Sequence, residues 1–184
     1  KSGLVYPGIG FVIGRDQEHL PEDLVFHDNY LGGDMPTFTL NYSRPGNQVE
    51  GQYYNFVRLG RSGYTRIMRM LQGIALEVSA RVAEIGPFSI VSDGSAIPVL
   101  SFTVSDDVPF TAFDVSDRLR YHGWQVPAYT MPDNATDVAV LRIVIREGFT
   151  YDIGKSLIEH LEEAAADLAE NPPVKSANRA GFAH

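Results

Sequence analysis

The longest hydrophobic pattern in the chain covers residues 47–85. Apolar side chains recur there at spacings of three and four residues, which places them on one face of an α-helix. Gly86 and Pro87 end the pattern, because both residue types are typical of helix ends. A single helix of this length exceeds the usual range in globular proteins. We therefore expect a connecting helix that bends near Gly60 and Gly63.

The residues after this helix alternate between strand patterns and helical patterns. Thr111 and Asp114 fit a capping box at the start of a helix, and Gly123 fits the stop at its end. The predicted strands are residues 88–91, 97–104, 124–129 and 137–145, and the predicted helices are 111–123 and 151–170. Residues 86–170 thus predict a compact α+β unit, a small sheet with helices on one face.

The residues before the long helix carry strand patterns. Residues 4–13 form two apolar stretches around Pro7 and Gly8, which predicts a buried strand or a tight hairpin. Residues 24–30 and 36–42 are further strand candidates because they are rich in aromatic and β-branched side chains. A chain that enters directly as an apolar strand pattern is typical of the later part of a larger protein.

Composition narrows the classes of partner. The 184 residues carry a formal net charge of −8, which argues against a nucleic-acid backbone or an anionic membrane as partner. The absence of cysteine excludes disulfides, thiolate metal sites and a cysteine nucleophile. No apolar run approaches the roughly 20 residues of a membrane span, and the first residues do not form a signal peptide.

The residues alone leave the candidate chemistry open. Residues 30–33, Tyr-Leu-Gly-Gly, form either a mobile loop over a site or a turn between strands, and the pattern favours the turn. Arg142 interrupts the apolar stretch "VAVLRIVI", so we expect a buried charge that serves as a structural ion pair or as a carboxylate clamp. Lys1 is either a chemical nucleophile or simply the first residue. His19, His27, His122 and His160 lack metal-ligand spacing, so we expect no metal site.

Five long segments add a resemblance to a known family. They are "KSGLVYPGIGFVIGRD", "LVFHDNYLGGDMPTFTLNYSRPGNQV", "QYYNFVRLGRSGY", "LRYHGWQVPAYTMP" and "VLRIVIREGF". Together they resemble the bacterial and plant glutamate decarboxylases, which use pyridoxal 5'-phosphate (PLP). The resemblance covers nearly the whole chain, in order, and corresponds to the carboxyl-terminal portion of such an enzyme.

The resemblance implies a fold and a domain organisation. The fold is α/β, the aspartate-aminotransferase-like fold type I of PLP-dependent transferases. Residues 1–46 would be the terminal strands and loop of the large PLP-binding domain, and residues 47–85 the connecting helix. Residues 86–170 would be the small carboxyl-terminal α+β domain, and residues 171–184 a flexible tail.

The resemblance also implies roles for individual residues. Lys1 would form the Schiff base with PLP, and Ser43 would hydrogen-bond the cofactor phosphate across a dimer interface. Tyr30 and Leu31 would belong to a mobile loop that closes over the substrate, with the tyrosine placed to protonate or shield the reacting intermediate. Arg142 would pair with the α-carboxylate of the amino acid and hold the breaking bond perpendicular to the cofactor ring.

The expected activity is conversion of L-glutamate to γ-aminobutyrate and CO2 by a cytoplasmic homo-oligomer built from dimers. A decarboxylase of another acidic amino acid and a non-catalytic isolated domain remain alternatives. His184 resembles a regulatory histidine that enters the active site of acid-activated bacterial relatives at neutral pH, and a loose end remains the alternative. Calmodulin is not expected as a partner, because Lys175 and Arg179 are the only basic residues of the tail and it has no tryptophan.

Overall fold

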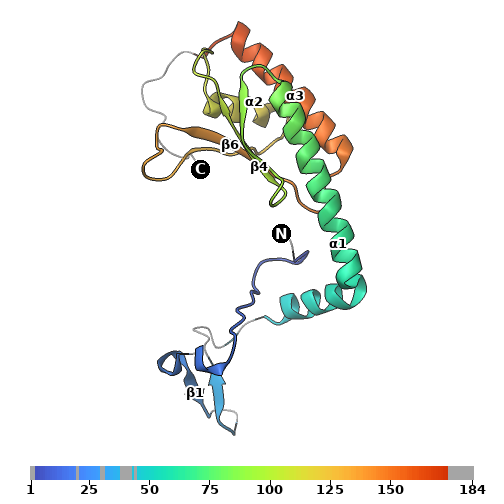
Figure 1. The fold of residues 1–184 in the computed structure, drawn as a ribbon, viewed down its shortest axis with the longest axis vertical. Helices are drawn as coiled ribbons and strands as arrows, with labels where there is room; N and C mark the ends of the chain where they lie inside the picture. The colour runs from blue at the N-terminus through green and yellow to red at the C-terminus, as the bar shows by residue number, and fades with distance from the viewer. Residues whose placement is uncertain (1–2, 20, 30–31, 38–42, 44, 174–184) are drawn as a thin grey trace. The chain divides into compact units, whose positions relative to one another are not determined.

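The computed structural model describes residues 3–19, 21–29, 32–37, 43 and 45–173. Contacts divide the chain into two compact units, one containing residues 3–60 and the other beginning at Arg61 (Figure 1). The division falls inside the long helix. Each unit is described separately below. In the described part of the chain, no helix combines the length and the apolar character that crossing a membrane requires.

The predicted long helix is α1, Asn47–Glu84. Its backbone leaves the helical region at Gly60, where φ is 55° and ψ is −172°. This conformation is open to glycine and strained for other residues, which explains why the helix changes course at this residue. The prediction of a helix with a bend is therefore confirmed, and Gly60 forms the kink.

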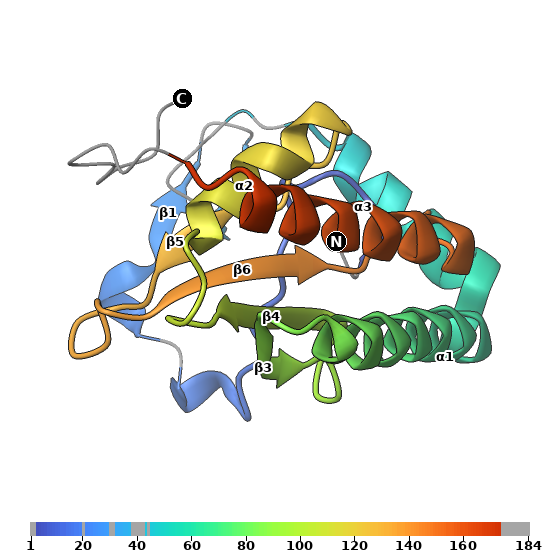
Figure 2. The same ribbon diagram turned by 90° about the horizontal axis from the view of Figure 1, so that it is seen from above.

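The second unit contains a four-stranded antiparallel sheet. Its strands are β3 (Phe88–Asp93), β4 (Val99–Val104), β5 (Ala128–Thr130) and β6 (Ala139–Val144), in the order β3-β4-β6-β5. Helix α2 (Ala112–Tyr121) lies between β4 and β5 in the sequence, and α3 (Tyr151–Glu170) follows β6. Figure 2 shows α2 and α3 together over one side of the sheet. The four strands and two helices expected in this region are confirmed.

One face of this sheet builds the hydrophobic core. Leu100 and Phe102 of β4 pair with Ile143 and Leu141 of β6, and all four side chains are buried. The three helices add their apolar faces to the same cluster, including Ile74, Val78, Val82, Val115, Leu119, Leu157, Ile158 and Leu161. The helices therefore cover one face of the sheet, as predicted.

The boundaries of α2 follow from local hydrogen bonds. The backbone N–H of Thr111 donates to the Asp114 carboxylate at 2.8 Å, and the Asp114 N–H donates to the Thr111 hydroxyl at 3.4 Å. This is the capping box that the sequence predicts. After the helix, Gly123 has a φ of 82°, and its N–H donates to the Arg120 carbonyl. The predicted stop is therefore also confirmed.

The first unit contains a small hairpin before α1. Strand β1 (Phe26–Asp28) pairs antiparallel with β2 (Met35–Thr37), and 3₁₀ turns lie at Gln17–His19 and Glu22–Leu24. These strands are shorter than the two predicted segments, 24–30 and 36–42. Residues 30 and 38–42 lie outside the described residues.

The prediction of a buried strand or hairpin over residues 4–13 is wrong. The residues there form bends and irregular backbone, and Phe11, Val12 and Ile13 expose 67%, 102% and 92% of their surface. A strand needs a neighbour to pair its backbone groups and a second layer to cover its side chains. No other described segment supplies either one. The apolar side chains of Phe11, Val12 and Ile13 therefore lie exposed in the described part of the chain.

Candidate functional site

Arg142 lies in the middle of β6, opposite Ser101 of β4. Its backbone N–H donates to the carbonyl of Pro127 at 3.1 Å. Its neighbours Leu141 and Ile143 are buried, whereas Arg142 itself is exposed. The expectation of a buried charge is therefore wrong, because alternate residues of a strand point to opposite faces and the helices cover only one face.

Tyr129 holds the Arg142 side chain on this open face. The two residues come from neighbouring strands, where Tyr129 pairs with Val140, so Arg142 is a diagonal neighbour on the same face. The guanidinium carbon lies 5.5 Å from the centre of the tyrosine ring. Stacking uses the flat face of a guanidinium and leaves its N–H edge available to an anion. Within the described residues no ion pair joins Arg142 to a carboxylate.

Ser43 lies in the first unit and is exposed. Gly46, three residues later, accepts backbone hydrogen bonds from Val49 and Glu50 at the start of α1. The hydroxyl of Ser43 and the guanidinium of Arg142 are donors of the kinds that bind a phosphate and a carboxylate, so their chemistry fits a phosphate-bearing cofactor and an amino-acid substrate. Lys1, Tyr30, Leu31 and His184 lie outside the described residues.

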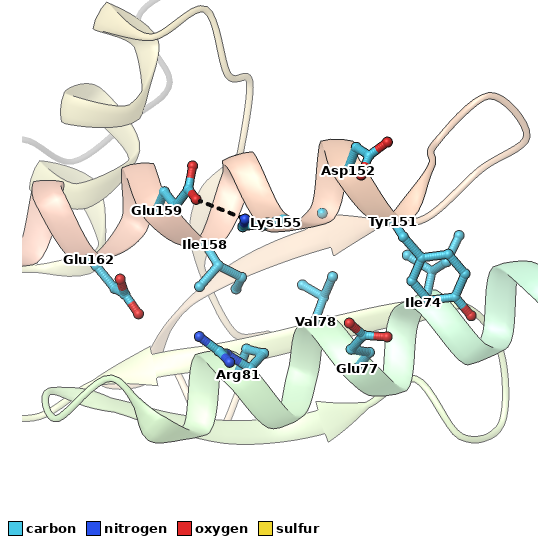
Figure 3. Close-up of a pocket in the computed structure, with 11 residues that line it drawn as sticks. Ile74, Glu77, Val78, Arg81, Tyr151, Asp152, Lys155, Ile158, Glu159 and Glu162 are labelled. Atoms are coloured by element: carbon cyan, nitrogen blue, oxygen red, sulfur yellow. Dashed lines mark ion pairs between the residues drawn. The ribbon is translucent and has the colours of Figure 1, made fainter.

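A pocket of about 390 Å³ lies between α1 and α3 of the second unit (Figure 3). Ile74, Val78 and Ile158 contribute its apolar surface, and Lys155 pairs with Glu159 at 3.9 Å on its rim. None of the residues predicted for the site lines it. The pocket thus does not coincide with the predicted chemistry.

The fold also brings together two histidines that lie far apart in the sequence. The rings of His122 and His160 stack with their centres 4.1 Å apart, and Glu163 lies 3.7 Å from Nε2 of His122. The indole N–H of Trp124 donates to Nδ1 of His160 at 2.8 Å. A neutral imidazole that accepts at Nδ1 carries its proton on Nε2, so His160 offers no free lone pair to a metal while this bond holds. We therefore interpret the cluster as a packing contact between the end of α2 and α3.

His19 and His27 occupy exposed positions beside Asp16 and Asp34. His122 is the C-cap residue of α2. These three histidines therefore occupy surface or capping positions.

The first unit contains a further contact that the sequence pattern did not predict. Gln52 and Asn55 of α1 donate side-chain hydrogen bonds to the carbonyls of Gly3 and Leu4, at 3.1 and 2.9 Å. The residues lie about 50 positions apart in the chain, so no local pattern joins them. The available signal was the pair of amides three residues apart, which an α-helix places on one face.

Comparison with known proteins decides the family. The conserved domain of pyridoxal-dependent decarboxylases matches residues 1–105, which is more than half of the chain. The chain belongs to the pyridoxal-dependent decarboxylase family. The predicted cofactor, PLP, is thereby confirmed for the family of this chain.

Relatives of this pyridoxal-dependent decarboxylase are named glutamate decarboxylase. The chain is 46% identical to the Solanum lycopersicum protein over 94% of its own length and 34% of that protein. It is 44% identical to the Aliivibrio fischeri protein over 94% of its own length and 38% of that protein. The chain therefore spans about a third of the length of these curated relatives.

Solved structures confirm the predicted fold class. A Lactobacillus brevis glutamate decarboxylase matches with a TM-score of 0.88 and 41% identity, covering 95% of this chain and 40% of that one. A Burkholderia pseudomallei sphingosine-1-phosphate lyase matches with a TM-score of 0.61 at 21% identity, which shows the shared fold alone. The pyridoxal-dependent decarboxylase chain thus has the fold type I architecture of PLP-dependent enzymes.

Proposed function

We propose that the chain is the carboxyl-terminal part of a glutamate decarboxylase, and that the intact enzyme converts L-glutamate to γ-aminobutyrate and CO2. The observation that carries this proposal is Arg142, an exposed guanidinium stacked on Tyr129 without a carboxylate partner among the described residues. The names and 43–46% identities of the relatives support the same substrate.

Each proposed residue supplies a group suited to its role. The Lys1 amine would condense with the aldehyde of PLP, whose oxygen leaves as water, and the Ser43 hydroxyl would donate to the cofactor phosphate. PLP, when bound, accepts the electron pair released as the carboxylate leaves. Arg142 would hold the α-carboxylate through its N–H edge, which orients the bond that breaks.

Further parts of the proposal concern residues outside the described part of the chain. Tyr30 and Leu31 would cover the bound substrate and exclude water, and the tyrosine hydroxyl would hold a proton near the reacting carbon. His184 would regulate the enzyme through its protonation. The assignment of residues 1–46, 47–85, 86–170 and 171–184 to separate parts of the enzyme is likewise proposed, as are a homo-oligomer built from dimers, a cytoplasmic location and the absence of calmodulin binding.

The clamp is tested by Arg142→Lys in the intact enzyme. Lysine keeps the charge but loses the planar fork and its stacking on Tyr129. We expect turnover to fall at least tenfold, equivalent to about 1.4 kcal/mol, while PLP stays bound. Steady-state kinetics with glutamate and the cofactor absorbance give the two measurements.

Arg146→Lys is the matched control, because Arg146 is an exposed arginine just beyond the same strand. Its substitution should leave turnover unchanged. Turnover of Arg142→Lys within about twofold of the wild-type rate would show that Arg142 is not the clamp. Faster turnover of another acidic amino acid than of glutamate would instead favour a related decarboxylase, and absence of PLP binding by the intact protein would favour a non-catalytic domain.

A further inference from the structure

Two side-chain amides of α1 hold the backbone that follows Lys1. Nε2 of Gln52 donates to the carbonyl of Gly3 at 3.1 Å, and Nδ2 of Asn55 donates to the carbonyl of Leu4 at 2.9 Å. Residues 52 and 55 are one helical turn apart and share a face of α1. The two amides therefore act on consecutive peptide groups of one segment.

The contact is closely packed. Gln52 exposes only 5% of its surface, although it is a polar residue. A Cβ atom built at Gly3 would lie 2.6 Å from Oε1 of Gln52, so any larger residue would have to displace the buried amide. A Cβ atom built at Gly51 would lie 3.5 Å from Cγ1 of Val5, which shows that the helix backbone is also close to the segment.

The segment is also strained at Leu4. Its φ is 58°, in the left-handed region, and Leu4 and Asn134 are the only residues other than glycine with positive φ in the described part of the chain. A bulky side chain rarely adopts this conformation unless the surrounding structure imposes it. The Gly3 and Leu4 carbonyls belong to the peptide groups on either side of the Leu4 Cα atom. Bonds to both carbonyls fix the two dihedral angles of Leu4.

We propose that Gln52 and Asn55 are positioning residues for Lys1. The inference rests on the proposed role of Lys1 as the residue that attaches PLP. The Cα atom of Gly3 is two residues along the chain, within about 7 Å of the Lys1 Cα atom, so fixing the Gly3 and Leu4 peptides restricts where the lysine side chain begins. The two amides thus limit the region within which Lys1 can lie, and small displacements of a reacting group lower the rate strongly.

The test uses the intact holoenzyme with Gln52→Met, which keeps the length of the side chain but removes the donor. We expect kcat to fall at least tenfold with KM for glutamate within about twofold. We also expect a shifted pH midpoint of the long-wavelength cofactor absorbance, because the attached nitrogen of Lys1 changes its environment. Gln72→Met is the matched control, since Gln72 also donates its side-chain amide to a backbone carbonyl, that of Ser95 in the second unit.

A second variant covers the case in which Gln52→Met does not fold. Asn55 is only half-buried, and Asn55→Asp replaces its donor with a group that repels the Leu4 carbonyl. It should reproduce the lower kcat and the shifted midpoint. The proposal is overturned if either folded variant keeps kcat within twofold and an unchanged midpoint, or if Gln72→Met shifts the midpoint equally.

Two further measurements distinguish a failure of this inference from a failure of the proposed function. Gly3→Ala should lower kcat by displacing Gln52. Its effect on kcat should therefore be smaller in the Gln52→Met background. Fully multiplicative effects of the two substitutions would contradict the positioning role of Gln52. Borohydride reduction and peptide mass spectrometry of the wild-type enzyme locate the attached cofactor. Attachment of PLP to a residue other than Lys1 would overturn the proposed function. Attachment at Lys1, with kcat and the absorbance midpoint unchanged in Gln52→Met and Asn55→Asp, would overturn this inference alone.

Discussion

At the scale of single residues, one position along β6 separates a core side chain from an exposed one. Leu141 is fully buried and Arg142 is exposed, although both stand in the same apolar stretch. The cost of burying an unpaired guanidinium is large, so the register that turns Arg142 to the open face avoids that cost. The same register brings Arg142 beside Tyr129.

Asp93 permits a prediction about pH at this scale. Hydrogen bonds from the side chain and then the backbone of Ser95 lower the pKa of the exposed Asp93 carboxyl from its ordinary value of 3.8. The backbone N–H of Ser95 donates to Oδ1 at 2.9 Å. Carboxyl-carbon NMR titration should therefore give a pKa below 3.8, and Ser95→Ala should raise it because the side-chain donor is lost.

The sign of the accompanying stability effect follows from the lowered pKa. The stabilising contribution of Asp93 is present above its unfolded pKa and is lost as the pH falls through the folded one. Ser92→Ala is the control, because Ser92 donates to Val99 and leaves both bonds from Ser95 in place. An Asp93 pKa that does not move in Ser95→Ala would contradict the assigned cause.

At the scale of elements, α1 serves two different surfaces. Before Gly60 its polar face holds residues 3 and 4 through Gln52 and Asn55. After Gly60 its apolar face, with Ile74 and Val78 among others, is buried in the core of the second unit. The two halves of α1 thus make contacts of different kinds, hydrogen bonds from side-chain amides in the first unit and apolar packing in the second.

Gly60→Ala tests the importance of the kink. A Cβ atom built at Gly60 meets no atom within 4 Å, so any cost arises from backbone strain at a φ of 55°. We expect a loss of about 1–3 kcal/mol in the free energy of unfolding, measured by urea denaturation of the intact protein.

Gly86→Ala is the matched control for Gly60→Ala. Its Cβ atom would also meet nothing within 4 Å, and its φ does not lie in the left-handed region. This substitution should be neutral or slightly stabilising. Equal stabilities of the two variants would mean that the Gly60 conformation relaxes without cost.

At the scale of the whole molecule, the described part of the chain has exposed side chains in two places that bear on the site. One is the apolar stretch Phe11, Val12 and Ile13, and the other is the face of the sheet that carries Arg142 and Tyr129. Both fit a chain that spans 34–40% of the related glutamate decarboxylases, whose remaining length would supply the partner surfaces. The complete site is thus proposed to require residues beyond this segment.

The 184-residue segment expressed by itself should therefore bind PLP poorly and show no decarboxylase activity. Lys1 alone would form only a solvent-exposed imine, because the segment supplies too few other groups to hold the cofactor. Dialysis followed by absorbance spectroscopy and a CO2-release assay with glutamate measures both properties. Stoichiometric PLP after dialysis together with CO2 release would show that the segment contains a complete site.

Local sequence signals determined most of the elements. The 3.6-residue period of α1, the capping box at Thr111 and the glycine stop at Gly123 each act through neighbouring residues, so they can be read without the fold. The strands of the second unit were also predicted, because their partners lie in the same part of the chain. Long family motifs indicated the family and its cofactor.

Tertiary structure decided what depends on distant partners. The burial of Arg142 depended on which face the helices cover, and the predicted strand over residues 4–13 lacked a described neighbour to pair with. The contact of Gln52 with Gly3 and the stack of His122 on His160 join residues 49 and 38 positions apart. The sequence by itself determined most of the elements and the family, because these follow from local geometry and extended motifs. Only the fold determined exposure and contact, because both depend on how segments far apart in the chain pack together.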